Sequence, residues 1–308
     1  MRVLLVFNPV SGRGAGARLA DELHDAMQHQ GHGVDKFQTS PDDFTAELTA
    51  GLDGIDVMCV IGGDGTVRSV AGAAAAVGTP FVHVPMGTEN LLARGMRMRR
   101  SVDDVVSTVE HGHCVPIDLA RCNGEPSVLM ASIGLDAQIV HDVTAARGSS
   151  LSKWLYVKSM ASRLMHHEPP VCTVTVDDHM VVENTPGWLI IANAPDYGWR
   201  FDPAPQARVN DGQLDVVFLP ARSGWGMLAW AARCRLGMHL RSVDARSVRG
   251  RSVQVTCASP APLQIDGDPP WGDGAVASMH MEIDANPLHV LVPPWAESCR
   301  PLADHSAG

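Results

Sequence analysis

The segment Cys59-Val60-Ile61-Gly62-Gly63-Asp64-Gly65-Thr66 is an apolar run that ends abruptly in glycines, and an alanine-rich helical stretch follows it from Val67 to Val77. A strand that ends in consecutive glycines and turns directly into a helix brings backbone N–H groups close to an anion, because no Cβ blocks the approach and the helix N-terminus is partially positive. The segment therefore predicts a phosphate-binding turn. Asp64 favours metal-assisted phosphate chemistry over simple anion capture, and a tight βα turn with an incidental carboxylate is the alternative.

Length and composition narrow the class of protein. The 308 residues suffice for two domains, and 45% hydrophobic with 19% charged residues is a globular composition. The formal net charge of −10 argues against a nucleic-acid partner. Seven cysteines without a C-x-x-C pair fit a reducing compartment, and no apolar run is long enough to span a membrane. We expect a soluble cytoplasmic protein, with any membrane contact peripheral at the inner membrane face and homodimer formation left open.

The pattern of predicted strands and helices changes near Pro116. Before it, strand patterns such as Arg2–Phe7 and Phe81–Val84 alternate with helical patterns, which predicts a parallel sheet covered by helices on both sides. After it, short β-type runs separated by Gly, Asn, Asp and Pro predict an antiparallel sandwich or barrel; they are Ile117–Cys122, Val128–Ile133, Val171–Val176, Trp188–Ala192, Leu214–Leu219, Val253–Cys257 and Met279–Ile283. Helical patterns at Ser152–Met165 and Gly224–Leu236 are expected to pack on this sheet rather than dock on a membrane.

Two other glycine-containing segments follow predicted strands of the first half. Asn8-Pro9-x-Ser11-Gly12-x-Gly14 follows the first strand, and Pro85-Met86-Gly87-Thr88-Glu89-Asn90 follows another. The carboxyl ends of parallel strands lie at one edge of a sheet, where open α/β sheets bind ligands. We therefore expect the three segments to converge on one site. The patterns G-x-x-x-x-G-K-[S/T] and G-x-G-x-x-G do not occur, so neither a P-loop NTPase nor a Rossmann dinucleotide site is supported.

Taken in order, these three segments resemble the motifs of the diacylglycerol kinase catalytic-domain family, which includes bacterial lipid kinases and sphingosine kinases. Farther along, Asn210-Asp211-Gly212-x-Leu214-Asp215 is similar to the family's Asp-Gly-x-Leu-Asp stretch, and Gln264-Ile265-Asp266-Gly267-Asp268 to its late Asp-Gly-Glu motif. The resemblance spans nearly the whole chain, and the ordered set of five is specific. Gly-Gly-Asp-Gly alone is shared with NAD kinases and phosphofructokinases.

The resemblance implies a Rossmann-like α/β domain of the phosphofructokinase and NAD-kinase type, a C-terminal β-sandwich domain, and a nucleotide in the cleft between them. The implied boundaries are residues 1–116 with a return over about 293–308 for the first domain, Leu288–Val292 with Pro293-Pro294 being the crossing, and 117–292 for the second. The implied activity is an ATP- and Mg²⁺-dependent lipid kinase that phosphorylates a hydroxyl of diacylglycerol or a long-chain base. An NAD kinase-like enzyme and a catalytically lapsed nucleotide sensor are the alternatives.

Site residues follow from the same resemblance, position by position. Asp266 matches the general base, and Asp64 and Asp268 complete the candidate catalytic carboxylates. Asp211 matches a structural magnesium site together with the carbonyls of Arg208 and Gln213. The candidate nucleotide-binding residues are Asn8, Pro9, Ser11, Gly12, Thr39, Gly62, Gly63, Asp64, Gly65, Thr66, Val67, Arg68, Gly87, Thr88 and Asn90.

Three positions depart from the family pattern. Asp268 stands where Glu is usual, Glu89 stands where a small residue is usual, and Tyr197–Phe201 replaces a glycine-rich stretch. The last change adds aromatic bulk that is expected to alter the acceptor pocket. The arginines at 94, 97, 99 and 100 are expected to form a solvated helix end rather than a membrane contact.

Overall fold

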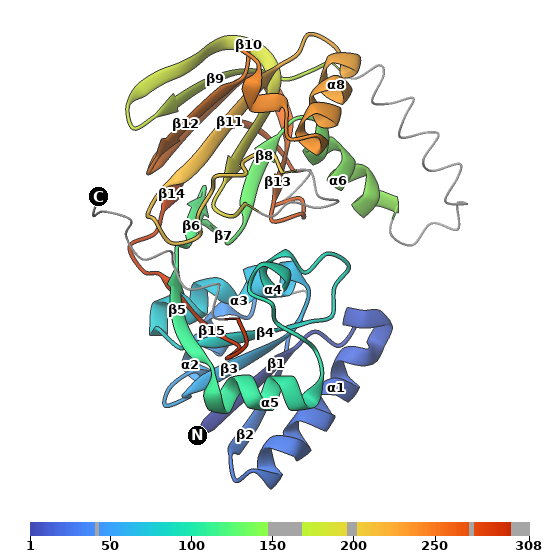
Figure 1. Ribbon diagram of the computed structural model, residues 1–308, viewed down its shortest axis with the longest axis vertical. Coiled ribbons are helices and arrows are strands. Elements are labelled where there is room, and N and C mark those ends of the chain that lie inside the picture. Colours follow the sequence, from blue (N-terminus) through green and yellow to red (C-terminus); the bar gives the residue numbers. More distant parts are fainter. Residues whose placement is uncertain (41–42, 147–167, 196–201, 271–273, 297–308) are drawn as a thin grey trace. The chain divides into compact units, whose positions relative to one another are not determined.

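The computed structural model describes residues 1–40, 43–146, 168–195, 202–270 and 274–296. The chain divides into two compact units, residues 1–119 with 284–308 and residues 120–283. The expected helix at Ser152–Met165 and the departure at Tyr197–Phe201 lie outside the described residues. Figure 1 colours the chain by residue number and labels the elements of both units.

The first unit is a sheet between two helical layers. Its described strands run in the order β2-β1-β3-β4-β15-β5, parallel except for β5, which pairs antiparallel with β15. Helices α1 and α5 pack together on one face, and α2 and α3 pack together on the other. The strands are β1 (Arg2–Phe7), β2 (Gly33–Gln38), β3 (Val57–Gly62), β4 (Phe81–Pro85), β5 (His113–Ile117) and β15 (Leu288–Val292); the helices are α1 (Ser11–His29), α2 (Thr45–Gly51), α3 (Asp64–Val77), α4 (Leu91–Gly95) and α5 (Val102–His111).

Burial explains this arrangement. All six residues of β3 are buried, as expected for a central strand covered on both faces. Leu23 and Met27 of α1 pack with Val105 and Val109 of α5 in one apolar cluster on the sheet. The side chain of Ser101 accepts the N–H of Asp104 and caps the start of α5.

The second unit is a two-layer β structure in which two long strands belong to both layers. The first part of β10 pairs with β9 and its last residues with β8 and β11, while β13 pairs first with β9 and β14 and then with β8. The described elements are β6 (Ala120–Cys122), β7 (Glu125–Ser127), β8 (Met130–Ile133), β9 (Val171–Val176), β10 (His179–Ala192), β11 (Leu214–Pro220), β12 (Arg246–Gly250), β13 (Ser252–Ile265), β14 (Ala275–Ile283), α6 (Leu135–Ala146), α8 (Gly224–Arg235) and the 3₁₀ turn η2 (His239–Arg241).

The boundaries between the two units lie at other residues than the sequence analysis expects. The run Ile117–Cys122, expected as one strand, is divided: Ile117 ends β5 in the first sheet, and β6 pairs with β14 in the second unit. The return to the first unit begins at Asp284 rather than near residue 293, because Leu288–Val292 is not a connection but a strand between β4 and β5. The observed divisions are therefore 119/120 and 283/284 instead of 116/117 and 292/293.

Candidate functional site

Four neighbouring strands of the first sheet end beside one another in candidate nucleotide-binding residues. In sheet order, Thr39 follows β2, Asn8 follows β1, Gly62 ends β3 and Gly87 lies two residues beyond β4. Their backbones are tied together: Asn8 N–H donates to Ile61 O at 3.1 Å, and Thr39 N–H donates to Phe7 O at 3.0 Å. The structure thus brings the predicted segments to a single sheet edge.

Glycines are required where two of these segments touch. A Cβ on Gly87 would lie 2.7 Å from the Cα of Gly63, and one on Gly62 would lie 2.3 Å from Oγ1 of Thr66. Gly12 adopts a φ of +59°, and its Cβ would lie 2.6 Å from the terminal methyl of Met86. A larger residue at Gly63 or Gly87 would push the second and third segments apart, and one at Gly62 would clash with Thr66 in its own segment, so the sequence pattern at this edge has a direct steric cause.

Asn90 closes the third segment on itself. Its Oδ1 accepts the N–H of Gly87 at 2.7 Å, and its Nδ2 donates to the carbonyl of Gly87 at 2.8 Å. Asn90 has a φ of +48°, a conformation that Asn tolerates better than most residues. The side chain therefore shapes a tight turn that leaves Thr88 exposed at its tip.

The carboxylate of Asp64 links the second segment to the third. Asp64 is the first residue of α3, yet its oxygens accept the N–H groups of Leu91 at 2.9 Å and Leu92 at 3.3 Å, which open α4. Burial raises the pKa of Asp64, and the carboxylate of Glu89 acts in the same direction, whereas the two N–H groups and Arg94 lower it. A carboxylate has about four lone-pair positions, so two amides do not exhaust it.

The other candidate residues of this edge differ in what they expose. Asn8 Oδ1 accepts the N–H of Val10 at 3.1 Å and shapes the first segment, which Pro9 and Ser11 continue at intermediate exposure. Gly65 and Arg68 are half-buried on α3. Val67 is 1% exposed and its N–H donates to Gly63 O, so its side chain belongs to the interior rather than to the edge.

In the second unit, Asp266 occupies a nest of N–H groups. Its carboxylate accepts from the amides of Val128 at 2.7 Å, Leu129 at 2.8 Å and Met130 at 2.9 Å, and from Ser127 Oγ at 3.2 Å. The side chain is held there by a two-residue turn: Asp266 and Gly267 have φ of +52° and +85°, and Ile265 and Asp268 exchange both backbone hydrogen bonds. This Asp-Gly turn has the twist of a type I′ hairpin.

A buried polar network lies behind that turn. Gln264 accepts the N–H of Gly267 at 2.7 Å and donates to Ser132 Oγ, which in turn donates to Asp136; Trp188 Nε1 also donates to Asp136, at 2.8 Å. Burial raises the pKa of Asp136, while its hydrogen bonds from Ser132, Ala137 and Trp188 lower it. The network fixes the orientation of Gln264 and hence of the turn that carries Asp266.

Comparison with known proteins agrees with this geometry. Residues 2–122 match the diacylglycerol kinase catalytic domain, and residues 129–292 match the YegS C-terminal NAD kinase beta sandwich-like domain. The chain belongs to the diacylglycerol kinase catalytic-domain family, with a YegS-like C-terminal domain.

Individual relatives are distant but extend over most of the chain. A diacylglycerol kinase of Bacillus subtilis is 24% identical over 272 residues, which are 87% of this chain and 89% of that one. An uncharacterized protein of Synechocystis is 23% identical over 280 residues, 86% of this chain but 65% of the longer relative. A crystal structure of a putative diacylglycerol kinase from Bacillus anthracis has the same fold, with a TM-score of 0.74 at 17% identity and 96% coverage of both chains.

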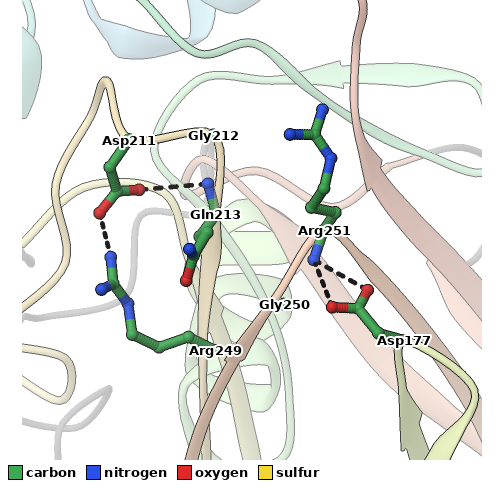
Figure 2. Close-up of a pocket in the computed structure, with 7 residues that line it drawn as sticks. All are labelled: Asp177, Asp211, Gly212, Gln213, Arg249, Gly250 and Arg251. Carbon is green, nitrogen blue, oxygen red and sulfur yellow. Dashed lines mark hydrogen bonds and ion pairs between the residues drawn. The ribbon is translucent and has the colours of Figure 1, made fainter.

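At the structural magnesium site that the family resemblance implies, the carboxylate of Asp211 already has partners within the protein. Oδ1 of Asp211 accepts the N–H of Gln213 at 3.1 Å, and Oδ2 forms an ion pair with Arg249 (Figure 2). Nε of Arg249 also lies 3.4 Å from Oδ2 of Asp215. A guanidinium therefore already faces both carboxylates. Burial raises the pKa of Asp215; Arg249 opposes that shift and Asp211 adds to it. Arg208, whose carbonyl belongs to the implied site, has an exposed side chain.

A cavity of about 260 Å³ lies beside this ion pair, lined by Asp177, Asp211, Gly212, Gln213, Arg249, Gly250 and Arg251. Asp177 accepts the N–H groups of Arg251 and Ser252, each at 2.9 Å. Two carboxylates and two guanidinium groups line the cavity, so their formal charges balance.

Other charged groups singled out in the sequence have structural partners. Arg94 pairs with Glu89 at 3.6 Å, which offsets the unusual carboxylate of the third segment. Arg99 lies 3.9 Å from Asp104 and 5.1 Å from the centroid of the Trp295 ring. Within the described part of the chain, no helix is long and apolar enough to cross a membrane.

Two residues with structural roles were not predicted from the sequence: His83 at the sheet edge and Arg249 beside Asp211. His83 of β4 is fully buried and donates from Nε2 to Gly62 O at 3.1 Å, the carbonyl that also accepts Met86 N–H. Burial lowers the pKa of His83 to about 4, against the effect of the Gly62 carbonyl. Arg249 was missed as well. The polar character of His83 in an apolar strand was a usable signal, whereas nothing in the sequence near Arg249 indicated its partners.

Proposed function

We propose that this protein transfers the γ-phosphoryl group of ATP, taken up as its magnesium complex, to a hydroxyl of diacylglycerol or a related lipid. The observation that carries the proposal is the convergence of three glycine-containing segments at one sheet edge, with Asp64 joining two of them. Membership of a family of lipid kinases and the diacylglycerol kinases among the relatives support the choice of reaction.

The proposed phosphate contacts follow from the geometry of α1 and α3. Both helices begin at this edge, at Ser11 and Asp64, so their partially positive N-termini lie at the same edge of the sheet although the helices cover opposite faces. The first turn of α1 contains no acidic residue, and the carboxylate of Asp64 is engaged by the N–H groups of α4. We assign the phosphates to these two helix ends and to the backbone of Gly12, Gly63 and Gly87.

Phosphoryl transfer requires positioning and charge stabilisation more than covalent chemistry. In this proposal Asp64 orients the magnesium ion that arrives with the nucleotide, through water, using the lone pairs that the two N–H groups leave. The carboxylate also holds the second and third segments at a fixed separation. Asp64 thereby acts on both the geometry and the charge of the phosphate site.

Asp266 is proposed to take the proton of the acceptor hydroxyl, a step that typically contributes about 10²–10⁴-fold. Its surroundings add a condition. Oδ1 accepts the hydrogen bonds of Ser127, Leu129 and Met130, whereas Oδ2 accepts that of Val128, so Oδ2 is proposed as the oxygen that takes the proton. Asp268, at the other end of the same turn, is proposed to assist with a carboxylate one methylene shorter than the usual Glu.

The test is transfer from radiolabelled ATP to a panel of diacylglycerol, monoacylglycerol, sphingosine, ceramide and NAD, followed by separation of the products. Label in a lipid product, absent from an Asp64→Asn control, is the expected result. Label in NAD alone would establish the NAD kinase-like alternative. Binding of ATP without transfer to any acceptor would favour the lapsed sensor.

A further inference from the structure

Helix α8 has two apolar faces, and the described residues cover only one of them. Met227, Trp230 and Cys234 are buried against the β structure of the second unit, and Trp230 Nε1 donates to Pro220 O at 2.7 Å. This face confirms the expected packing of the helix on the sheet, where Figure 1 shows α8 beside β11 and α6.

The opposite face is an exposed apolar stripe. Trp225, Ala229, Ala232 and Leu236 are spaced at i, i+4, i+7 and i+11, which places them in one row along the helix. Trp225 is 64% exposed and Leu236 is 70% exposed, and Met238 and Val243 in the following segment are 48% and 89% exposed. Exposed large apolar side chains gathered over one element mark an interaction surface.

Basic residues frame this stripe without acidic ones. Between positions 221 and 243 there are four arginines, at 222, 233, 235 and 241, and no Asp or Glu, in a chain whose net charge is −10. All four are exposed. In the part of the chain that the structure describes, none pairs with a carboxylate; Arg233 lies 4.9 Å above the Trp230 ring instead. Arg94 and Arg99 on the first unit, by contrast, face Glu89 and Asp104.

We propose that this surface, Trp225 to Val243, docks the protein on an anionic lipid bilayer. An aromatic and aliphatic stripe flanked by arginines is the composition of a helix that lies in the membrane interface, with its apolar face among the acyl chains and its basic residues at the headgroups. Two copies of the chain meeting through the stripe would bring like charges together, so charge complementarity favours lipid over self-association. The choice of lipid as partner rests on the proposed function.

The experiment is co-sedimentation of the full chain with vesicles of phosphatidylcholine, and of phosphatidylcholine and phosphatidylglycerol in equal parts. Wild type is expected to sediment with the anionic vesicles only. The double variants Trp225→Ser/Leu236→Ser and Arg233→Glu/Arg235→Glu are each expected to lower the partition coefficient by at least about tenfold. Their matched controls are Val77→Ser/Met180→Ser, which also removes exposed apolar side chains, and Arg18→Glu/Lys36→Glu, which makes the same charge change elsewhere.

Three outcomes would overturn the proposal: wild type that stays in solution, control variants that lose binding as strongly as the α8 variants, or a dimer in sedimentation velocity that Trp225→Ser/Leu236→Ser converts to monomer. The kinase assay in detergent micelles separates this proposal from the proposed function. Lipid phosphorylation in micelles without vesicle binding refutes only the docking surface. Vesicle binding that depends on α8, without phosphorylation of any lipid, refutes only the kinase.

Discussion

Asp64 caps a helix that is not its own: Oδ2 accepts the N–H of Leu91, 27 residues later in the chain, at 2.9 Å. One carboxylate therefore serves both the fold of the third segment and the proposed phosphate chemistry. We predict that Asp64→Asn, which keeps an acceptor for the cap but no charge, loses kinase activity with little change in Tm. Asp64→Ala is expected to lose activity and about 1 kcal/mol of stability, a few degrees in Tm.

The comparison of these two variants by calorimetry and by rate separates the roles. Equal melting temperatures for Asp64→Asn and Asp64→Ala would show that the cap contributes nothing. An Asp64→Asn enzyme with the wild-type rate would remove Asp64 from the chemistry.

Asp266→Asn is predicted to retain nucleotide binding and to lose most of the turnover. The amide also turns an NH₂ toward backbone N–H donors, so we expect a stability loss of about 1–3 kcal/mol in chemical denaturation. Ser127→Ala is the matched control, because it removes only the hydroxyl that donates to Oδ1. That variant should keep its turnover number; a turnover loss equal to that of Asp266→Asn would make Asp266 an anchor rather than a base.

His83 should make stability depend on pH. Its pKa is about 4 in the fold and 6.5 in an unfolded chain, so the unfolded state binds more protons between these values. The contribution is complete above pH 6.5 and is lost as the pH falls toward 4, by about 3 kcal/mol. Urea midpoints measured across this range should be flatter for His83→Gln, which keeps a donor for Gly62 O. Parallel curves for the two proteins would contradict the assignment.

Arg249 should make the Asp211 corner independent of divalent ions. We expect wild type to melt at the same temperature in EDTA and in millimolar Mg²⁺, because the guanidinium already faces both carboxylates. Arg249→Met leaves Asp211 and Asp215 unbalanced, so its Tm should fall and then rise on addition of Mg²⁺ or Ca²⁺. A wild-type Tm that drops in EDTA would instead support a bound divalent ion at Asp211.

The architecture followed from local patterns. Apolar runs ending in glycine predicted β3 and its neighbours, and the rule that parallel strands end at one edge predicted that Asn8, Gly63 and Gly87 converge. These features depend on residues adjacent in the chain and on a general property of parallel sheets. For the same reason, the Gly, Asn, Asp and Pro residues between short apolar runs predicted the β-rich character of the second half.

The partners of the charged side chains could not be predicted this way. Asp266 meets Val128 across 138 residues, and Arg249 meets Asp211 across 38, so each contact depends on how separate strands are paired. A motif names the carboxylate but not the groups that surround it. The expected strand at Ile117–Cys122 failed for a related reason, because the pairing of Ile117 with β15 and of Cys122 with β14 divides an otherwise continuous pattern.

The position of β15 also constrains how the protein forms during synthesis. Strands β4 and β5 are neighbours of β15 and not of each other, so the first sheet has a gap until Leu288–Val292 leave the ribosome. By then every strand of the second unit has already been translated. The N-terminal unit therefore completes its sheet last, and a nascent chain stalled before residue 288 carries an open strand edge exposed to aggregation or to chaperones.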